Sequence, residues 1–202
     1  MARPPVDPSR PATPERILDA ATEVFARDGF VGARLAEIAA GAEVKRPSLL
    51  YHFATKQVLY EAVVRRTFSR LGDALGEVMA REGAFAERLR GVALTYASYI
   101  AGHPSDARIV VQEMTGNTGP GQAILIDQVT PLLDAVVRFI EREGDGALRP
   151  GLLVRHAVLQ VAASELIAHA ASDDVRAALW GPADPSRTAT LATTLFLTEE
   201  VS

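Results

Sequence analysis

Cysteine is absent from this 202-residue sequence. Its absence excludes disulfide frameworks, thiolate metal sites and cysteine nucleophiles. No stretch reaches the roughly 18 uncharged apolar residues that a membrane-spanning helix needs. The opening residues, MARPPVDPSRPATP, lack the apolar core of a secretory signal. We therefore expect a cytoplasmic protein with no membrane partner.

Patterns typical of enzymes are also missing. The four histidines are too scattered to predict a zinc site, and the pair Glu165 and His169 at helical spacing is too few ligands for one. The glycine-rich run at 116–121 lacks the Lys-Ser/Thr pair of a phosphate-binding loop. No Gly-x-Ser-x-Gly nucleophile turn occurs. The sequence therefore favours a non-enzyme, with no metal and no cofactor.

What is present indicates an all-α fold. Apolar residues make up 48% of the chain and charged residues 23%, the balance of a globular protein with a substantial core. Segments rich in Ala, Leu, Val, Glu and Arg favour helix, and no alternating strand pattern of useful length appears. The net charge is −4, yet residues 1–60 carry eight basic and seven acidic side chains. This mild asymmetry identifies the N-terminal end as the one able to meet DNA.

The N-terminal part predicts a flexible arm followed by short helices. Residues 1–13 hold four prolines without apolar periodicity, and they are expected to be a plain tail or an arm whose Arg3 and Arg10 contact DNA. A helix is expected from the cap Thr13 to Gly29. Further helices are predicted at 34–41 and 46–53, and Thr55 is expected to cap a long helix that starts at residue 56.

Helical patterns continue through the rest of the chain. Predicted helices end near Gly102 and Gly144, and others cover about 106–115 and 150–171 and open at Asp184-Pro185-Ser186. The helix over 150–171 is apolar nearly all round, which indicates contacts on two sides. We therefore predict an arm at 1–13, a helix-turn-helix domain at 14–58 and a ligand-binding and dimerisation domain at 59–202.

Residues 34–53 carry the functional signal. Leu35, Ile38 and Ala39 supply an inward face, Ala42 and Val44 fill a turn, and Leu49 anchors the next helix. The helix that follows the turn then points cations, a hydroxyl and a tyrosine outward, which a recognition helix needs for phosphates and base edges. Plain structural roles stay open for several of these residues: Tyr51 and Phe53 as core aromatics, His52 as a helix-end residue and Lys56 as a solvated one.

Residues 14–60 resemble the N-terminal domain of the TetR family of bacterial regulators. The resemblance is carried by Ile17-Leu18-Asp19-Ala20-Ala21, Phe25, Gly29-Phe30, Ile38-Ala39, Leu49-Leu50-Tyr51-His52-Phe53 and Thr55-Lys56. It implies a dimeric repressor that binds palindromic double-stranded operator DNA and is released by a small-molecule inducer. Carried over by position, the implied DNA contacts are Arg34, Lys45, Arg46, Pro47, Ser48, Tyr51, His52 and Lys56.

Two positions depart from the family pattern. Ala33 and Arg34 stand where a hydroxyl residue usually precedes the second helix, and Glu43 stands at the usual turn glycine. Glu43 places a carboxylate near DNA, so a relative that senses ligand without binding DNA stays open as an alternative. The resemblance does not decide between repression and activation.

The C-terminal part matches the family only in its layout. The layout implies that the last two helices form a four-helix bundle with a second subunit and that an inducer pocket lies among the helices from about 60 to 143. Ordinary packing roles stay open for its candidate residues. These are polar or aromatic groups on apolar faces: Tyr96, Tyr99, His103, Gln112, Glu113, Met114 and Phe139.

Overall fold

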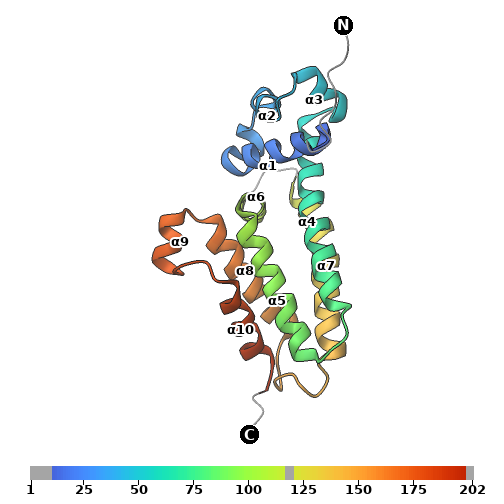
Figure 1. Ribbon diagram of the computed structural model, residues 1–202, viewed down its shortest axis with the longest axis vertical. Coiled ribbons are helices and arrows are strands. Elements are labelled where there is room, and N and C mark those ends of the chain that lie inside the picture. Colours follow the sequence, from blue (N-terminus) through green and yellow to red (C-terminus); the bar gives the residue numbers. More distant parts are fainter. Residues whose placement is uncertain (1–10, 117–120, 199–202) are drawn as a thin grey trace. The chain divides into compact units, whose positions relative to one another are not determined.

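The computed structural model describes residues 11–116 and 121–198, and over these residues it is helical without a named strand (Figure 1). The helices are α1 (Thr13–Gly32), α2 (Leu35–Gly41), α3 (Arg46–His52), α4 (Lys56–Met79), α5 (Phe85–Gly102), α6 (Pro104–Thr115), α7 (Gly121–Glu143), α8 (Val154–Ala170), α9 (Asp173–Leu179) and α10 (Pro185–Phe196). The expected all-α fold is confirmed. Arg3 and Arg10 of the predicted arm lie outside the described residues.

The chain divides into two compact units, 1–63 and 64–202. The division falls inside α4, whereas the domain boundary predicted from the sequence was placed after residue 58, near the start of this helix. Helix α4 therefore begins in the N-terminal unit and continues into the C-terminal one.

Helix α1 begins at Thr13, whereas the predicted cap at Thr13 would have started the helix at residue 14. Ala12 occupies the cap position and no side chain caps the helix, so the assignment of Thr13 as the cap was wrong. Pro14 lies in the first turn, directly after Thr13, where its fixed φ suits the helix and its missing N–H is not needed. Gly29 has a φ of 67° and ends the regular part of α1, as the sequence predicted, before one more turn to Gly32.

The core of the N-terminal unit joins α1 to α2, α3 and the start of α4. Ile17, Phe25, Ile38, Leu49 and Leu59 are buried. The fully buried ring of Tyr60 meets Phe25 edge-on, with 4.8 Å between ring centres, and Phe30 lies 5.2 Å away. These aromatic contacts fix the scaffold on which α2 and α3 are displayed.

The C-terminal unit packs α5 against α10 and α8, with α8 also in contact with α6 and α7. Its core contains Leu75, Leu89, Ile140, Val161 and Phe196. In the described residues no helix is long and apolar enough to cross a membrane.

Three predicted details of this unit were wrong. Helix α6 begins at Pro104 rather than at residue 106, because proline suits a first turn. Helix α8 begins at Val154 rather than at residue 150. The preceding segment cannot be helical, because Leu148 forms an antiparallel bridge with Leu197 and Gly151 has a φ of 75°. Helix α9 was missed because it has only seven residues, too few for a clear apolar period, and it buries none of them.

Candidate DNA-binding surface and ligand cavity

A tight turn joins α2 to α3. Ile38, Ala39 and Ala42 are buried on one side of this turn and Leu49 on the other, so the crossing is held by small and aliphatic side chains. The Val44 N–H donates to the Ala39 carbonyl at 2.9 Å. Glu43 between them has a φ of 53°, and it is the one non-glycine residue with positive φ in the described part of the chain. The position is therefore a glycine position in conformation, occupied by glutamate.

Helix α3 presents its N-terminal half and its tyrosine to solvent. Lys45, Arg46 and Pro47 are exposed and Ser48 is half-buried. Tyr51 is 85% exposed, although tyrosine is among the residues that folding usually covers, and its ring meets that of exposed His52 at 5.3 Å. Phe53 is buried in the core. The fold thus separates the two aromatics of the Tyr-His-Phe run, one facing outward and one inward.

The remaining predicted DNA contacts lie at helix starts. Arg34 occupies the cap position of α2 and is exposed, with no side-chain bond to the helix. Thr55 Oγ1 accepts from the Val58 N–H at 3.1 Å, so Thr55 caps α4 as the sequence predicted. Lys56 follows in the first turn, where its Nζ donates to the carbonyls of Val31 at 3.0 Å and Ala33 at 2.7 Å. Its ammonium also lies 5.0 Å from the centre of the Phe30 ring.

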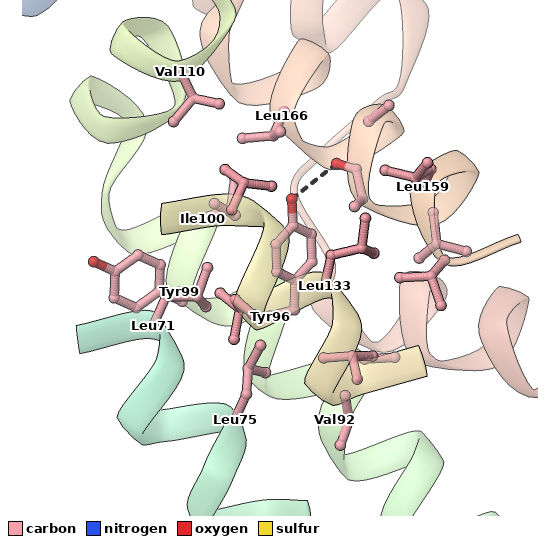
Figure 2. Close-up of a pocket in the computed structure, with 18 of the residues that line it drawn as sticks. Leu71, Leu75, Val92, Tyr96, Tyr99, Ile100, Val110, Leu133, Leu159 and Leu166 are labelled. Carbon is pink, nitrogen blue, oxygen red and sulfur yellow. Dashed lines mark hydrogen bonds between the residues drawn. The ribbon is translucent and has the colours of Figure 1, made fainter. Parts of the chain in front are cut away.

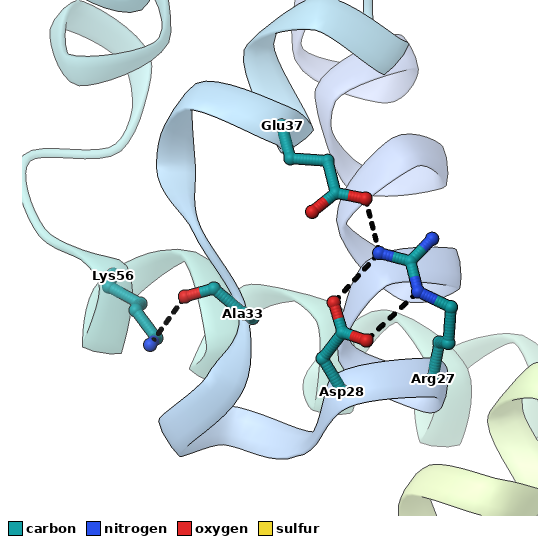
Figure 3. A network of polar contacts seen from close by, with 5 residues as sticks. All are labelled: Arg27, Asp28, Ala33, Glu37 and Lys56. Carbon is teal, nitrogen blue, oxygen red and sulfur yellow. Dashed lines mark hydrogen bonds and ion pairs between the residues drawn. The ribbon is translucent and has the colours of Figure 1, made fainter.

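An ion-pair network joins α1 to α2 beside the Lys56 contacts (Figure 3). The Arg27 guanidinium donates to both carboxylate oxygens of Asp28, at 2.9 and 2.7 Å, and to Glu37 of α2. The hydrogen bond from Arg27 lowers the pKa of the Asp28 carboxyl. The hydrogen bonds to Asp28 and then Glu37 raise the pKa of Arg27 above its already high value. Arg27 is therefore engaged within the protein, whereas Arg34, Lys45 and Arg46 are the other exposed arginine and lysine residues in the described part of this unit.

The C-terminal unit contains a cavity of about 240 Å³ (Figure 2). Its wall is mostly aliphatic and comes from α4, α5, α6, α7, α8 and α10. Representative lining residues are Leu71, Leu75, Ile100, Leu133, Val161 and Leu166. An apolar enclosure of this kind is the usual form of a small-molecule site.

Polar groups interrupt the wall at a few points. The Tyr96 hydroxyl donates to the Ala162 carbonyl of α8 at 2.9 Å (Figure 2). The Tyr99 hydroxyl lies 3.1 Å from the Thr67 carbonyl and 3.2 Å from Asp106 Oδ2. Burial raises the pKa of the Asp106 carboxyl, against the lowering effect of hydrogen bonds from Thr67 and Tyr99. Burial likewise raises the pKa of both tyrosines.

The cavity brings together three of the seven ligand candidates named from the sequence. Tyr96, Tyr99 and Met114 line it. Buried Glu113 lines a small neighbouring void of about 10 Å³ that shares Thr67 and Asp106 with the cavity. The other three candidates do not line the cavity: exposed Gln112, His103, which stacks on Tyr99, and Phe139, which packs against Phe85.

Sequence reasoning missed the polar residues Thr67 and Asp106. Asp106 lies in the first turn of α6, where an acidic residue is ordinarily an exposed partner of the helix dipole, so its 7% exposure could not be foreseen. The wall also extends beyond the predicted region of 60–143, because α8 and α10 contribute to it. Among the described residues no group of three or more potential ligands could hold a metal ion.

The chain has a helix-turn-helix unit followed by a helical unit with an apolar cavity. This arrangement is typical of helix-turn-helix regulators. The pattern described as "Bacterial regulatory proteins, tetR family" matches residues 17–63. The N-terminal part of the chain therefore matches the model of this family, as the resemblance of its motifs predicted.

Named relatives are regulators rather than enzymes. The chain is 33% identical over 129 residues to the HTH-type transcriptional regulator RutR of Escherichia coli, covering 62% of this chain and 57% of RutR. It is 22% identical over 155 residues to the HTH-type transcriptional repressor NicS of Pseudomonas putida, covering 74% and 72%. The chain thus matches little more than half the length of RutR.

The fold is shared with solved structures of transcriptional regulators. The transcriptional regulator FadR of Bacillus subtilis, in complex with stearoyl-CoA, superimposes with a TM-score of 0.68 at 19% identity, covering 90% of this chain and 96% of FadR. At this identity the likeness establishes the fold alone.

Proposed function

We propose that this protein is a ligand-responsive transcriptional repressor that binds a palindromic operator as a dimer. The observation that carries the proposal is the outward face of α3: Arg46 and Tyr51 are exposed on a helix whose other face is anchored by buried Leu49. A short helix with that division of faces, held after a tight turn, is what entry into a major groove requires.

The contacts of α3 divide between phosphates and bases. Lys45 and Arg46 at its N-terminal end supply cations for phosphates or guanine edges. Ser48 allows close approach, and the Tyr51 hydroxyl extends to a phosphate oxygen. Lys56 keeps one N–H beyond its two bonds to Val31 and Ala33, and this N–H extends the phosphate contacts to the start of α4.

Dimerisation is assigned to the exposed apolar side chains of α8 and α10. Leu159 and Ile167 of α8 are 43% and 52% exposed, and Leu191 of α10 is 52% exposed. Helices α8 and α10 also contact each other, so these side chains can form one apolar face that a second copy buries. Two-fold symmetry would then present two α3 helices to successive major grooves, about 34–36 Å apart or somewhat more.

Ligand binding is assigned to the cavity. The fold likeness to FadR, whose structure holds stearoyl-CoA, supports a ligand with an apolar chain for this cavity. Thr67, Phe68 and Leu71 of α4 line the cavity, and the same helix starts at Lys56 beside the proposed DNA contacts. A ligand that prefers one position of α4 shifts the population away from the DNA-binding form, provided that it binds the two forms unequally.

The relatives include both a transcriptional repressor, NicS, and a transcriptional activator, FasR of Mycolicibacterium smegmatis, so the proposed sign of repression needs a direct test. The direct test of the sign is a reporter gene under the upstream region of the gene for this chain. Deletion of the gene should raise expression of the reporter, whereas an activator would give a fall.

DNA binding is tested by titrating the purified protein against labelled duplex from upstream of its own gene, at two salt concentrations. A scrambled duplex of equal length is the control. Saturable binding that prefers the native duplex and weakens with salt is expected, because neutralised phosphates release counterions. Absence of binding to either duplex would overturn the repressor proposal in favour of a ligand sensor that does not bind DNA.

A further inference from the structure

The polar side chains in the cavity wall are neutral or acidic. Among the described residues that line the cavity, the groups with polar side chains are Thr67, Tyr96, Tyr99 and Asp106. Two are phenols, one is an alcohol and one is a carboxylic acid. None of the lining residues carries a positive charge, so the wall offers no cation to an anionic head group.

Hydrogen atoms on these groups are already committed within the protein. Tyr96 donates to the Ala162 carbonyl, and Tyr99 shares its single O–H between the Thr67 carbonyl and Asp106 Oδ2. The Thr67 side chain hydrogen-bonds to Asp106. Because a phenol has one O–H and its oxygen also accepts, what each tyrosine still offers a ligand is an acceptor. Asp106 adds carboxylate oxygens to the same end of the cavity, so this end of the wall is built to receive hydrogen-bond donors.

Basic side chains lie near Asp106 and Tyr99 but do not line the cavity. His103 stacks on Tyr99 with 4.3 Å between ring centres, and with Arg66 it favours the charged form of Asp106. Arg70 is exposed on α4 and acts in the same direction on Tyr99. Neither Arg66 nor Arg70 lines the cavity, so neither offers a ligand a direct hydrogen bond from the wall. A carboxylate ligand in the cavity would face a buried carboxyl group at close range, which is unfavourable in a medium of low polarity.

We propose that the cavity takes a lipophilic molecule whose polar end is a hydrogen-bond donor without negative charge, an alcohol or an amine, seated against Asp106 and Tyr99. The apolar body lies along Leu71, Leu133 and Leu166, and Asp106 determines the specificity. The inference rests on the proposed function only in taking this cavity as the ligand site. It separates this chain from a regulator that recognises a free fatty acid by its carboxylate.

The test compares decanol, decylamine and decanoate, which share one alkyl chain and differ in the head group. Each is added to the full-length protein without DNA, below its micelle concentration and at neutral pH, and the thermal unfolding midpoint and the Kd by calorimetry are measured. Decanol and decylamine are expected to bind saturably and raise the midpoint, and decanoate is expected to bind at least about tenfold more weakly.

Two variants localise the effect. Asp106→Asn keeps an acceptor for Tyr99 and removes the charge, so it should weaken decylamine by about tenfold and change decanol little. Ala93→Phe fills the cavity from α5 and should abolish binding of both, whereas Ala86→Phe at an exposed position of the same helix should not. Asp127→Asn is the matched exposed carboxylate and should leave all three affinities unchanged.

Decanoate binding as tightly as decylamine would overturn the inference, as would no binding by any probe or an unchanged decylamine Kd in Asp106→Asn. If Asp106→Asn does not fold, the order of the three probes on the unaltered protein decides the question. These measurements use no DNA. Failure of operator binding therefore leaves the inference standing, and tight decanoate binding leaves the repressor proposal standing.

Discussion

The ammonium of Lys56 donates a hydrogen bond of 2.7 Å to the carbonyl of Ala33, and a second of 3.0 Å to Val31, so the first turn of α4 is tied to the segment that precedes α2. The sequence resemblance implied only a phosphate contact for this lysine. The structure adds an internal role, in which Lys56 holds the connection between α1 and α2 against the start of the next long helix.

Lys56→Met is therefore expected to lower the free energy of unfolding by about 1–3 kcal/mol, because two carbonyls lose a charged donor while the aliphatic stem is kept. Urea unfolding measures this change. Gln57→Met, at the exposed neighbouring position, is the control and should have little effect. An unchanged unfolding free energy in Lys56→Met would mean that the two hydrogen bonds contribute nothing to stability.

Glu43 carries a conformational cost at the turn. Relative to glycine, a residue with a side chain in the left-handed region destabilises the folded protein by roughly 1–2 kcal/mol. Part of this difference is offset because glycine loses more conformational freedom on folding. Glu43→Gly should raise the free energy of unfolding by about 0.5–1 kcal/mol, whereas Glu43→Gln removes the charge and keeps the strain. Both should strengthen DNA binding equally, since both remove a carboxylate near the duplex. A stabilisation by Gln equal to that by Gly would assign the cost to charge instead of backbone.

Ile167→Glu combined with Leu191→Glu should abolish the proposed dimer, because each protomer would bury two charges on the proposed apolar face. Sedimentation velocity measures the change. Leu94→Glu, a 38% exposed position on α5, is the control and should stay dimeric. Retention of the dimer by the double variant would move the interface away from α8 and α10.

Asp106 gives the protein a defined dependence on pH. Its pKa is raised in the folded state from an ordinary value of 3.8, so the folded protein binds this proton more tightly than the unfolded chain does. The contribution of Asp106 to stability therefore falls as pH rises from near 3.8 to the folded pKa, and stays at the lower level above it. As the pH rises across that window, Asp106→Asn should therefore become more stable relative to the unaltered protein. A difference between the two proteins that does not vary with pH would contradict this account.

Much of the N-terminal unit could be predicted from the sequence, because its signals are local. The apolar spacing from Ile17 to Phe25, the cap Thr55 and the family motif each act within a few residues. The sequence left open whether Tyr51 and Phe53 are core residues. In the fold Tyr51 is exposed and Phe53 is buried. The two carbonyl partners of Lys56 lie more than twenty positions earlier in the chain, so no local pattern could reveal them.

The cavity was less accessible to prediction, because its polar end is a tertiary feature. Asp106 and Tyr99 lie close in sequence, but Thr67 joins them only through the packing of α4. Tyr96 looked like a core residue with a satisfied hydroxyl, and it is that as well as a cavity residue. Helix α9 has only seven residues, too few for an apolar period to predict it.

The most direct test of the central claim is the salt dependence of operator binding by the unaltered protein and by Arg46→Gln. Arg142→Gln, an exposed arginine at the end of α7, is the control of equal charge. The account predicts that Arg46→Gln weakens binding and reduces the slope of log affinity against log salt by about 1 per protomer, while Arg142→Gln matches the unaltered protein. Equal affinity and equal slope in all three proteins would contradict the assignment of α3 as the DNA-binding helix.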